Sequence, residues 1–389
     1  MESIRQLKND EMLESRKLIN FAFQHEEVAN MPLVQALPEQ VWGYFINNEL
    51  TSNIVILPVE TFVQGIAYRT GLIAGVASWP EYRKGGTVGK LLVQGMKDLY
   101  ERGYTLSTLG PFSYPFYRKY GWEMMYEYRT YRLRVDCVPD WQGSGNIRRI
   151  EQDISLLNPV YEKYASRFNG PLKRDELRWT STIFARKRGL IALYDNAFGE
   201  STGYMIYQIK NRLLTVHEMI YLDRDSRKGL WEFIRKQDSM FDFVQFTAPS
   251  DDNFAFLIDN PIGLETTMVT HLMARIIDVA GFIRKYRFSS GTVGETISLA
   301  VSDRYAPWNE GFFWLRMGKD GAVEVERSEG EMKKADIACN IQTLSTMLLG
   351  YRSPAFLHRE ERLQGDLTIV MKLEEWIPRR TTYYLDFGH

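Results

Sequence analysis

Apolar residues in the first third of the chain alternate between strand-like and helix-like spacing. Apolar runs at residues 54–57 and 72–79 predict two strands, the first closed by Pro58. Between residues 88 and 102 apolar positions recur every three or four residues, which predicts an amphipathic helix. Residues 104–109 return to the strand pattern. This alternation predicts a central sheet flanked by helices.

The middle third of the chain repeats part of this plan. Strand-like runs at residues 190–194, 203–209 and 215–222 precede a turn with Gly229 and then a helical segment, and residues 243–247 are again strand-like. Because the order and the rough lengths match those of the first third, we predict a faint internal duplication. The second turn contains one glycine where the first contains three.

The last third has a different pattern. Residues 296–301, 311–317 and 322–326 are strand-like, and the glycines at 318–321 predict a hairpin between the last two. Residues 341–349 predict a short apolar helix. A small α+β domain fits this part of the chain.

Glycine and serine cluster at residues 143–145 and between residues 286 and 291, which predicts two domain boundaries. We therefore expect domains at 1–145, 146–286 and 287–389. The predicted fold class is mixed α/β or α+β, with central sheets flanked by helices in the first two domains.

Composition narrows the function. The 389 residues carry a formal net charge of -1, whereas a dedicated nucleic-acid binder usually has a basic excess. The two cysteines, Cys137 and Cys339, are far apart and suit a reducing compartment. The chain begins without an apolar signal core and has no apolar run of membrane-spanning length. We expect a soluble cytoplasmic protein with no nucleic-acid or membrane partner, and the spacing of its histidines suggests no metal.

The most informative segment is the turn at residues 79–92. Arg83, Lys84, Gly85 and Gly86 lie between a predicted strand and a predicted helix. Amides of such a turn, at a helix N-terminus, form a concave anion site that suits a diphosphate. The alternative is an ordinary connection with solvated cations. Neither the P-loop spacing nor the three-glycine dinucleotide spacing is present.

The segment Arg83-Lys84-Gly85-Gly86-Thr87-Val88 resembles the pyrophosphate loop of the GNAT acetyltransferases. Valine at its last position is a feature of one branch, the enhanced intracellular survival (Eis) acetyltransferases. Four further blocks resemble that branch in the same order along the chain: residues 75–83, 116–123, 229–240 and 344–354. The resemblance implies tandem GNAT folds, the second degenerate, followed by a domain like sterol carrier protein.

The resemblance also implies an activity. We expect an N-acetyltransferase that uses acetyl-coenzyme A as cosubstrate and acetylates a primary amine by direct attack, without a covalent enzyme intermediate. An aminoglycoside, a polyamine and a lysine-like acceptor all remain open. By resemblance alone, a homo-oligomer, such as a hexamer, is expected. The middle domain lacks the multi-glycine turn, so we expect it to bind no coenzyme.

The resemblance assigns roles to individual residues. Tyr117 takes the position of the general acid, and a tyrosine with a pKa of about 10 stays protonated at neutral pH. Backbone groups of Val76, Ala77 and Ser78 are expected to bind the pantetheine arm, although Ser78 could instead face solvent. Packing alone is the alternative role for Tyr117.

The base is expected at the C-terminus, where the family uses its terminal carboxylate. The chain ends on His389 where typical relatives end on an aromatic residue, so either the carboxylate or the imidazole could act, or the tail could be frayed. Glu26, Glu27 and Asp386 are candidates to attract the cationic acceptor, or ordinary surface acids. Two other functions stay open: an acetyl-coenzyme A-binding scaffold or sensor, and a hydrophobic-ligand-binding protein.

Overall fold

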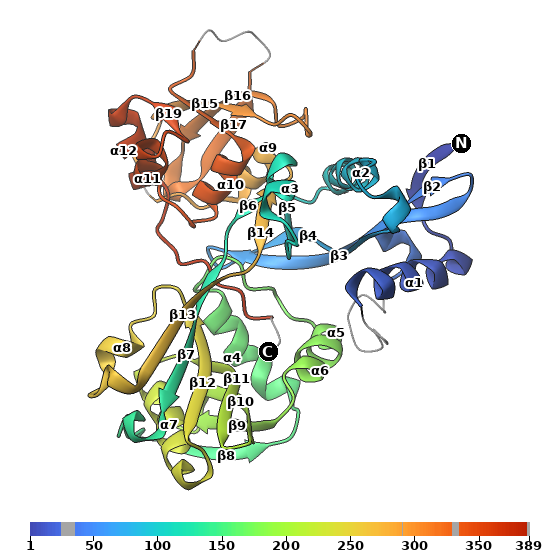
Figure 1. Cartoon of the computed structure of the whole chain (residues 1–389). Helices are drawn as coiled ribbons and strands as arrows, with labels where there is room; N and C mark the ends of the chain where they lie inside the picture. Colours follow the sequence, from blue (N-terminus) through green and yellow to red (C-terminus); the bar gives the residue numbers. More distant parts are fainter. Residues whose placement is uncertain (25–35, 290, 329–333, 387–389) are drawn as a thin grey trace. The chain divides into compact units, whose positions relative to one another are not determined.

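The computed structural model describes residues 1–24, 36–289, 291–328 and 334–386 (Figure 1). The chain divides into two compact units, and each is assembled from two separate stretches. Unit 1 contains Met1–Met125 and His271–Arg380, and unit 2 contains Tyr126–Thr270 and the tail from Thr381.

Unit 1 begins with a seven-stranded sheet in the order β1-β2-β3-β4-β5-β14-β6. Its neighbours are antiparallel except for β4 and β5, which are parallel. Its strands are β1 (Glu2–Gln6), β2 (Val41–Ile46), β3 (Glu49–Val63), β4 (Ile66–Ser78), β5 (Leu106–Leu109), β6 (Glu123–Met124) and β14 (Met273–Ile276). Its helices are α1 (Met12–Phe23), α2 (Thr87–Glu101) and α3 (Tyr114–Lys119).

The two longer helices cover opposite faces of this sheet. Leu92 of α2 packs in one core cluster with Ile54 and Ile56 of β3. Leu18 of α1 packs in another with Val55, which lies between those two isoleucines. Because alternate residues of a strand face opposite sides, β3 is covered on both faces, as the predicted sheet flanked by helices requires.

Pro58 does not close the third strand, contrary to the expectation from its sequence. β3 continues to Val63, and Pro58 pairs with Gly71 of β4. On the other side of β3, pairing with β2 ends at Val55. Proline lacks an N–H but is tolerated where one side of a strand has no partner to accept from it.

Unit 2 contains a seven-stranded sheet in the order β13-β7-β12-β11-β10-β9-β8, in which β11 and β12 are the parallel pair. Its strands are β7 (Glu127–Arg134), β8 (Asn146–Ile150), β9 (Leu190–Asp195), β10 (Ser201–Lys210), β11 (Leu213–Tyr221), β12 (Phe243–Pro249) and β13 (Leu264–Thr270). Its helices are α4 (Ile154–Ala165), α5 (Glu176–Arg178) with a π-helical turn (Trp179–Ile183) and α6 (Phe184–Arg186), α7 (Arg224–Arg235) and α8 (Phe254–Leu257).

The predicted duplication is confirmed by these two sheets. In both, an antiparallel pair of strands is followed by a helix that leads into a parallel strand: β3-β4-α2-β5 in unit 1 and β10-β11-α7-β12 in unit 2.

Two strands belong to a different sheet from the one that their position in the sequence predicted. Residues 127–134, expected in the first domain, form β7 of the second sheet, where they pair with β12 and β13. Residues 273–276, expected in the second domain, form β14 of the first sheet, between β5 and β6. Clusters of glycine and serine mark loops, and they carry no information about which sheet a neighbouring strand joins.

Unit 1 also contains a five-stranded sheet in the order β17-β16-β15-β18-β19. Its strands are β15 (Thr296–Ser302), β16 (Gly311–Met317), β17 (Val323–Arg327), β18 (Ile337–Asn340) and β19 (Gln364–Gly365). Its helices are α9 (Val279–Lys285), α10 (Ile341–Leu348), α11 (Pro354–Arg359) and α12 (Leu367–Trp376). The hairpin predicted at residues 318–321 joins β16 and β17. In the described part of the chain, no helix is both long and apolar enough to cross a membrane.

Candidate active site

One stretch of β4 lacks a neighbouring strand on one side. β4 and β5 pair in parallel as far as Ile73 and Leu109, where β5 ends. β4 continues to Ser78, and among the described strands only β3 pairs with this last stretch. On the side away from β3, Val76, Ala77 and Ser78 therefore have no strand partner among the described residues.

A bulge bends the same stretch. The register between β3 and β4 shifts between Asn53 and Val55, and Asn53 Nδ2 donates to the carbonyl of Gly75 at 2.7 Å. Gly75 has φ of 54°, a left-handed conformation that favours glycine. The bulge thus shifts the register of the last residues of β4, whose Ala77 and Ser78 still pair with Asn53 and Ser52 of β3.

The turn that follows leaves the N-terminus of α2 uncapped. Gly86, the N-cap residue, has φ of 79°, and no side chain caps the first amides of α2. A Cβ at Gly86 would find no atom within 4 Å. The first turn of α2 contains no acidic residue, and Arg83, Lys84 and Gly85 are exposed beside it. Free amides, a helix dipole and two cations favour an anion here.

Hydroxyl groups fix this turn to the end of β4. Ser52 Oγ donates to Ser78 Oγ at 2.9 Å and lies 2.8 Å from Thr87 Oγ1. All three residues are buried, so Ser78 does not simply face solvent. Arg83 Nε also donates to the carbonyl of Ser78, at 3.3 Å.

Tyr117 lies in α3, which begins shortly after β5 ends. Ser113 caps the helix by accepting from the amide of Phe116 at 3.4 Å. Tyr117 is 1% exposed, and its ring contacts those of Phe116 and Trp122 at centroid distances of 5.1 and 6.4 Å. Burial raises the pKa of Tyr117, so its hydroxyl stays protonated at neutral pH.

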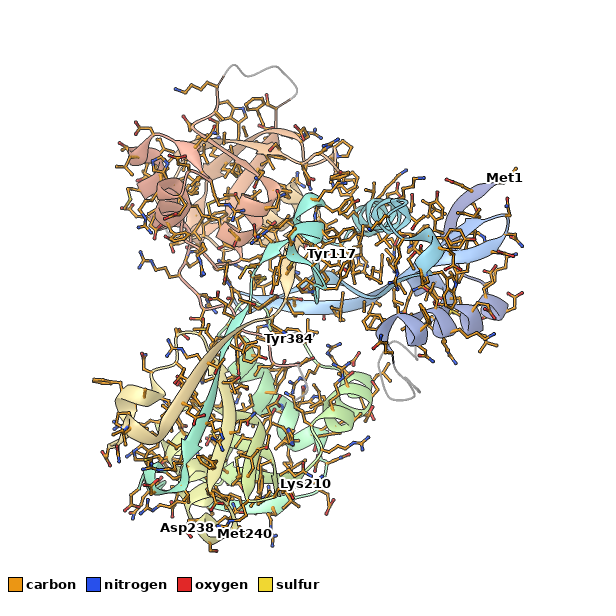
Figure 2. The ribbon with its side chains drawn as sticks, viewed as in Figure 1. Met1, Tyr117, Lys210, Asp238, Met240 and Tyr384 are labelled. Carbon is orange, nitrogen blue, oxygen red and sulfur yellow. The ribbon has the colours of Figure 1, made fainter. Side chains whose placement is uncertain are left out.

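The strand, the turn and α3 meet in one core cluster. Tyr117 is a buried member of this cluster, and Val76 of β4 and Val88 of α2 pack against it. A Cβ at Gly89 would lie 2.0 Å from Tyr120 Oη, which shows how closely α2 and α3 approach. Figure 2 shows Tyr117 on α3, beside the strands of the first sheet. The structure thus brings together the groups predicted for cofactor binding and for acid catalysis.

The remaining predicted site residues lie either outside the described part of the chain or in unit 2. Glu26, Glu27 and His389 lie outside the described residues. Asp386 is buried in unit 2, where its carboxylate accepts from Arg174 Nε at 2.9 Å and from the Arg178 guanidinium. Its oxygens are therefore already engaged by cations of the protein itself.

The network around Asp386 is a feature that the sequence reading missed. Arg174 also donates to both carboxylate oxygens of Glu218, at 2.9 and 2.7 Å. Lys187 Nζ donates to Glu218 and to the carbonyl of Leu385, both at 2.5 Å. Glu218 is the only acidic residue of β11, and a lone carboxylate in a mostly apolar strand was the available signal.

The corresponding turn of unit 2 is built differently. The N-cap of α7 is Asp223, whose carboxylate accepts from the amide of Ser226 at 2.7 Å. Asp225 adds a second negative charge in the first turn. The carboxylate of Asp223 already binds an amide that a phosphate would need, and the negative charges of Asp223 and Asp225 repel a phosphate. Both features support the prediction that this domain binds no coenzyme.

Within the described ranges no group of three or more histidine, cysteine, aspartate or glutamate side chains is arranged to hold a metal ion. That the protein needs no metal stays a prediction.

Comparisons with known families agree with this architecture. One model of the GNAT acetyltransferase domain matches residues 3–125, and another GNAT acetyltransferase model matches residues 170–276. The model of the sterol carrier protein domain matches residues 279–385. The three matches follow one another along the chain in the expected order.

Three individual proteins illustrate the similarity. A crystal structure from Enterococcus faecalis, described as a probable N-acyltransferase of unknown function, is 30% identical, covers 100% of both chains and has a TM-score of 0.91. Eis1 from Mycobacterium abscessus shares the fold over 100% of both chains, with a TM-score of 0.83 at 16% identity. An uncharacterized N-acetyltransferase from Streptomyces avermitilis is 24% identical over 340 residues, 81% of this chain and 79% of that protein. The chain is an acyltransferase that belongs to the GNAT N-acetyltransferases, and its two GNAT domains followed by a sterol carrier protein domain are the architecture of the Eis type.

Proposed function

We propose that the protein transfers the acetyl group of acetyl-coenzyme A to a primary amine, at the site that β4, the following turn and α3 form in unit 1. The observation that carries this proposal is the uncapped N-terminus of α2 at Gly86, directly after the open edge of β4. A diphosphate and the extended arm attached to it need these two features side by side. The bound thioester supplies the activated acetyl group.

Residues of the turn hold the diphosphate. The amides that follow Gly86, beginning with Thr87 and Val88, point from the helix N-terminus, and Arg83 and Lys84 add charge-assisted contacts. Backbone groups of residues 76–78 pair with the pantetheine arm and orient the thioester.

Tyr117 is the general acid. When the amine attacks the acetyl carbon, the C–S bond breaks and the thiolate leaves with the electron pair. Tyr117 donates its proton to that sulfur, and its raised pKa keeps the proton available before the reaction. Its burial in the cluster that includes Val76 and Val88 limits its freedom to move.

The C-terminus supplies the base that takes the proton of the amine, through the carboxylate or the imidazole of His389. Support comes from the segment just before it. Asp386 is bound by two arginines, and the backbone of Tyr383 donates to Asn169 at 3.0 Å. The described part of the tail is therefore held to unit 2 as far as Asp386.

The acceptor is a primary amine of the aminoglycoside, polyamine or lysine-like class. Glu26 and Glu27 remain the candidates to attract its positive charge. We also propose that the protein acts in the cytoplasm as a homo-oligomer, for which a hexamer is the expectation from resemblance.

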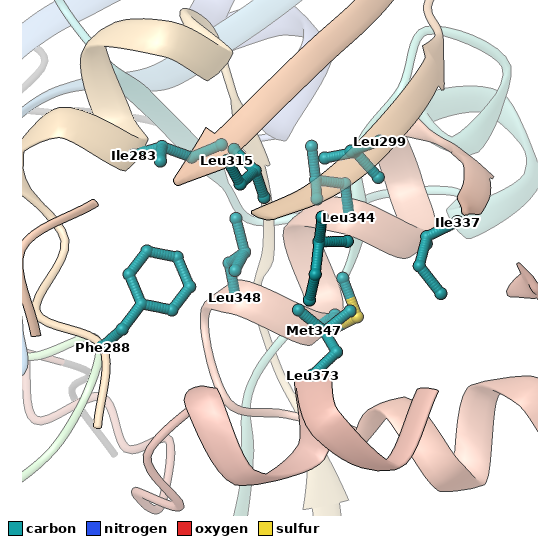
Figure 3. Close-up of a pocket in the computed structure, with 10 residues that line it drawn as sticks. Ile283, Phe288, Leu299, Leu315, Ile337, Leu344, Met347, Leu348 and Leu373 are labelled. Atoms are coloured by element: carbon teal, nitrogen blue, oxygen red, sulfur yellow. The ribbon is translucent and has the colours of Figure 1, made fainter. Parts of the chain in front are cut away.

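The cavity described in the core of the sterol carrier domain is too small for a lipid. It has a volume of about 10 Å³, and ten apolar side chains line it (Figure 3). Such a volume is close to that of a single water molecule. Phe288 and Leu344, both labelled in Figure 3, are two of the side chains that line this cavity.

The proposal is tested by measuring coenzyme A thiol release over a panel of amines. The variants are Tyr117→Phe and a chain that lacks residues 388 and 389. We expect Tyr117→Phe to lower kcat by about 100-fold, the usual size of an acid–base contribution, without weakening cofactor binding. Tyr114→Phe, in the same helix but less buried, is the matched control and should retain activity.

If Tyr117→Phe keeps full kcat on every active amine, the assignment of the acid is wrong. If the cofactor binds but no amine releases thiol, a scaffold or sensor becomes the better explanation. Loss of activity in the truncated chain indicates that His389 acts in catalysis. Unchanged activity contradicts a role for His389, because the only terminal group left is the new carboxylate of Phe387.

A further inference from the structure

Arg275 is a charged residue in an apolar strand. It lies in β14 between Ala274 and Ile276, and it is 0% exposed. A guanidinium removed from water is costly unless its N–H groups are paired. Each of its nitrogens has a partner, and those partners connect two parts of unit 1.

The first partner belongs to the sterol carrier domain. Arg275 Nη2 donates to the carboxylate of Asp303, which follows β15 and is itself 3% exposed. The same carboxylate accepts from Asn309 Nδ2 at 3.0 Å, and the amide of Asp303 donates to Glu310 at 2.7 Å. These hydrogen bonds hold Asp303 in place independently of Arg275.

The second partner ends the helix that carries the proposed acid. Arg275 Nη1 donates to the carbonyl of Tyr120 at 2.5 Å. Tyr120 is the C-cap of α3, and its amide donates to the carbonyl of Tyr117 at 3.0 Å. The positive guanidinium thus binds the C-terminal end of α3, where the helix dipole favours a cation.

Other side chains of the sterol carrier domain reach the same segment. Gln342 Nε2 donates to the carbonyl of Arg118 at 2.8 Å, and Arg362 Nη2 donates to Glu123 at 2.7 Å. The ring of Tyr305 lies 4.8 Å from that of Tyr120. The domain therefore contacts α3 and the residues after it at several points, by hydrogen bonds, an ion pair and ring packing.

We propose that Arg275 and Asp303 are positioning residues that hold α3, so that the sterol carrier domain serves to orient Tyr117 rather than to carry a lipid. This inference rests on the proposed role of Tyr117 as general acid. A helix of only six residues has little stability of its own, and its orientation must come from its neighbours. Small displacements of an acid from its reacting atom cost large factors in rate.

The test is Arg275→Lys, which keeps a positive charge opposite Asp303. A single ammonium cannot reproduce the forked geometry that binds both Asp303 and the carbonyl of Tyr120. We expect kcat for thiol release to fall by about tenfold or more, with KM for acetyl-coenzyme A and its calorimetric affinity unchanged. Arg167→Lys is the control for the loss of an arginine-to-carbonyl hydrogen bond alone, because the exposed Arg167 donates to the carbonyl of Leu222 at 2.5 Å in unit 2.

The double variant with Tyr117→Phe separates this inference from the function on which it rests. If Arg275 acts through Tyr117, adding Arg275→Lys to Tyr117→Phe lowers kcat no further. A loss in Tyr117→Phe with wild-type kcat in a folded Arg275→Lys overturns the positioning role alone. Full kcat in Tyr117→Phe overturns the acid itself.

A second variant decides the matter if Arg275→Lys does not fold. Gln342→Ala with Tyr305→Leu removes two contacts to α3 from partly exposed positions and leaves the buried pair intact. We expect a lower kcat with unchanged cofactor affinity and an unchanged circular dichroism spectrum. Wild-type kcat in this folded variant contradicts the proposal.

Discussion

Among single residues, the N-caps of α2 and α7 distinguish the two GNAT domains. Both helices follow a strand and lead into a parallel strand. At Gly86 the first amides of α2 are uncapped, whereas Asp223 caps α7 with a carboxylate. The sequence shows the glycines of the first turn, whereas the position of Asp223 as the N-cap of α7 depends on where that helix begins.

This difference predicts the effect of placing a carboxylate in the first turn. Gly86→Asp is expected to raise KM for acetyl-coenzyme A at least tenfold above that of Gly86→Asn, because only the aspartate repels a diphosphate. Asparagine has the same size and tolerates the left-handed conformation of Gly86 equally well. Equal KM values for the two variants in the thiol-release assay would show that the diphosphate binds elsewhere.

Among the elements, the C-terminal tail is held by a buried network that no pattern in the tail predicts. From the sequence, Asp386 was a candidate to attract the cationic acceptor or an ordinary surface acid, and nothing in the last seven residues predicts its burial. Its partners Arg174 and Arg178 are more than 200 residues away in sequence. Strands and amphipathic helices could be read from local spacing, whereas pairs so distant could not.

The network makes stability depend on pH. Burial alone raises the pKa of Asp386, but Arg174 and Arg178 outweigh it and hold that pKa below its ordinary value. A carboxylate with a lowered pKa stabilises the folded state above its unfolded pKa of about 3.9, and this contribution is lost as the pH falls through the folded pKa. The contribution of Asp386 to the thermal unfolding midpoint should therefore be full and constant between pH 6 and 8, and the midpoint should decrease as the pH drops below about 4.

Asp386→Asn tests this account. Removing the negative charge that pairs with Arg174 and Arg178 should lower the free energy of unfolding by about 3–5 kcal/mol at pH 7. On acidification, the variant should lose less of its remaining stability than the wild type. Asp366→Asn is the control, because Asp366 is an exposed N-cap of α12 and asparagine caps equally well. Parallel pH profiles for Asp386→Asn and the wild type would contradict the role of the network.

At the scale of the whole molecule, the chain builds each unit from two separate stretches. β14 completes the first sheet only after the whole of the second sheet has been passed in sequence. The sequence predicted three domains in the right order, because periodicity and turns are local and the blocks that carry the resemblance follow one another along the chain. It did not predict that residues 271–276 return to the first sheet, because strand pairing is decided by contacts across the sequence.

The central claim is that the turn before α2 binds the coenzyme and the corresponding turn before α7 does not. One measurement tests it most directly. Calorimetric titration of the wild-type chain with acetyl-coenzyme A should give one site per chain. Arg83→Ala with Lys84→Ala should weaken that affinity at least tenfold, or about 1.4 kcal/mol, whereas Arg224→Ala with Lys228→Ala at the turn of unit 2 should leave it unchanged. Two sites per chain, or a loss of affinity only in the second pair, would contradict the account.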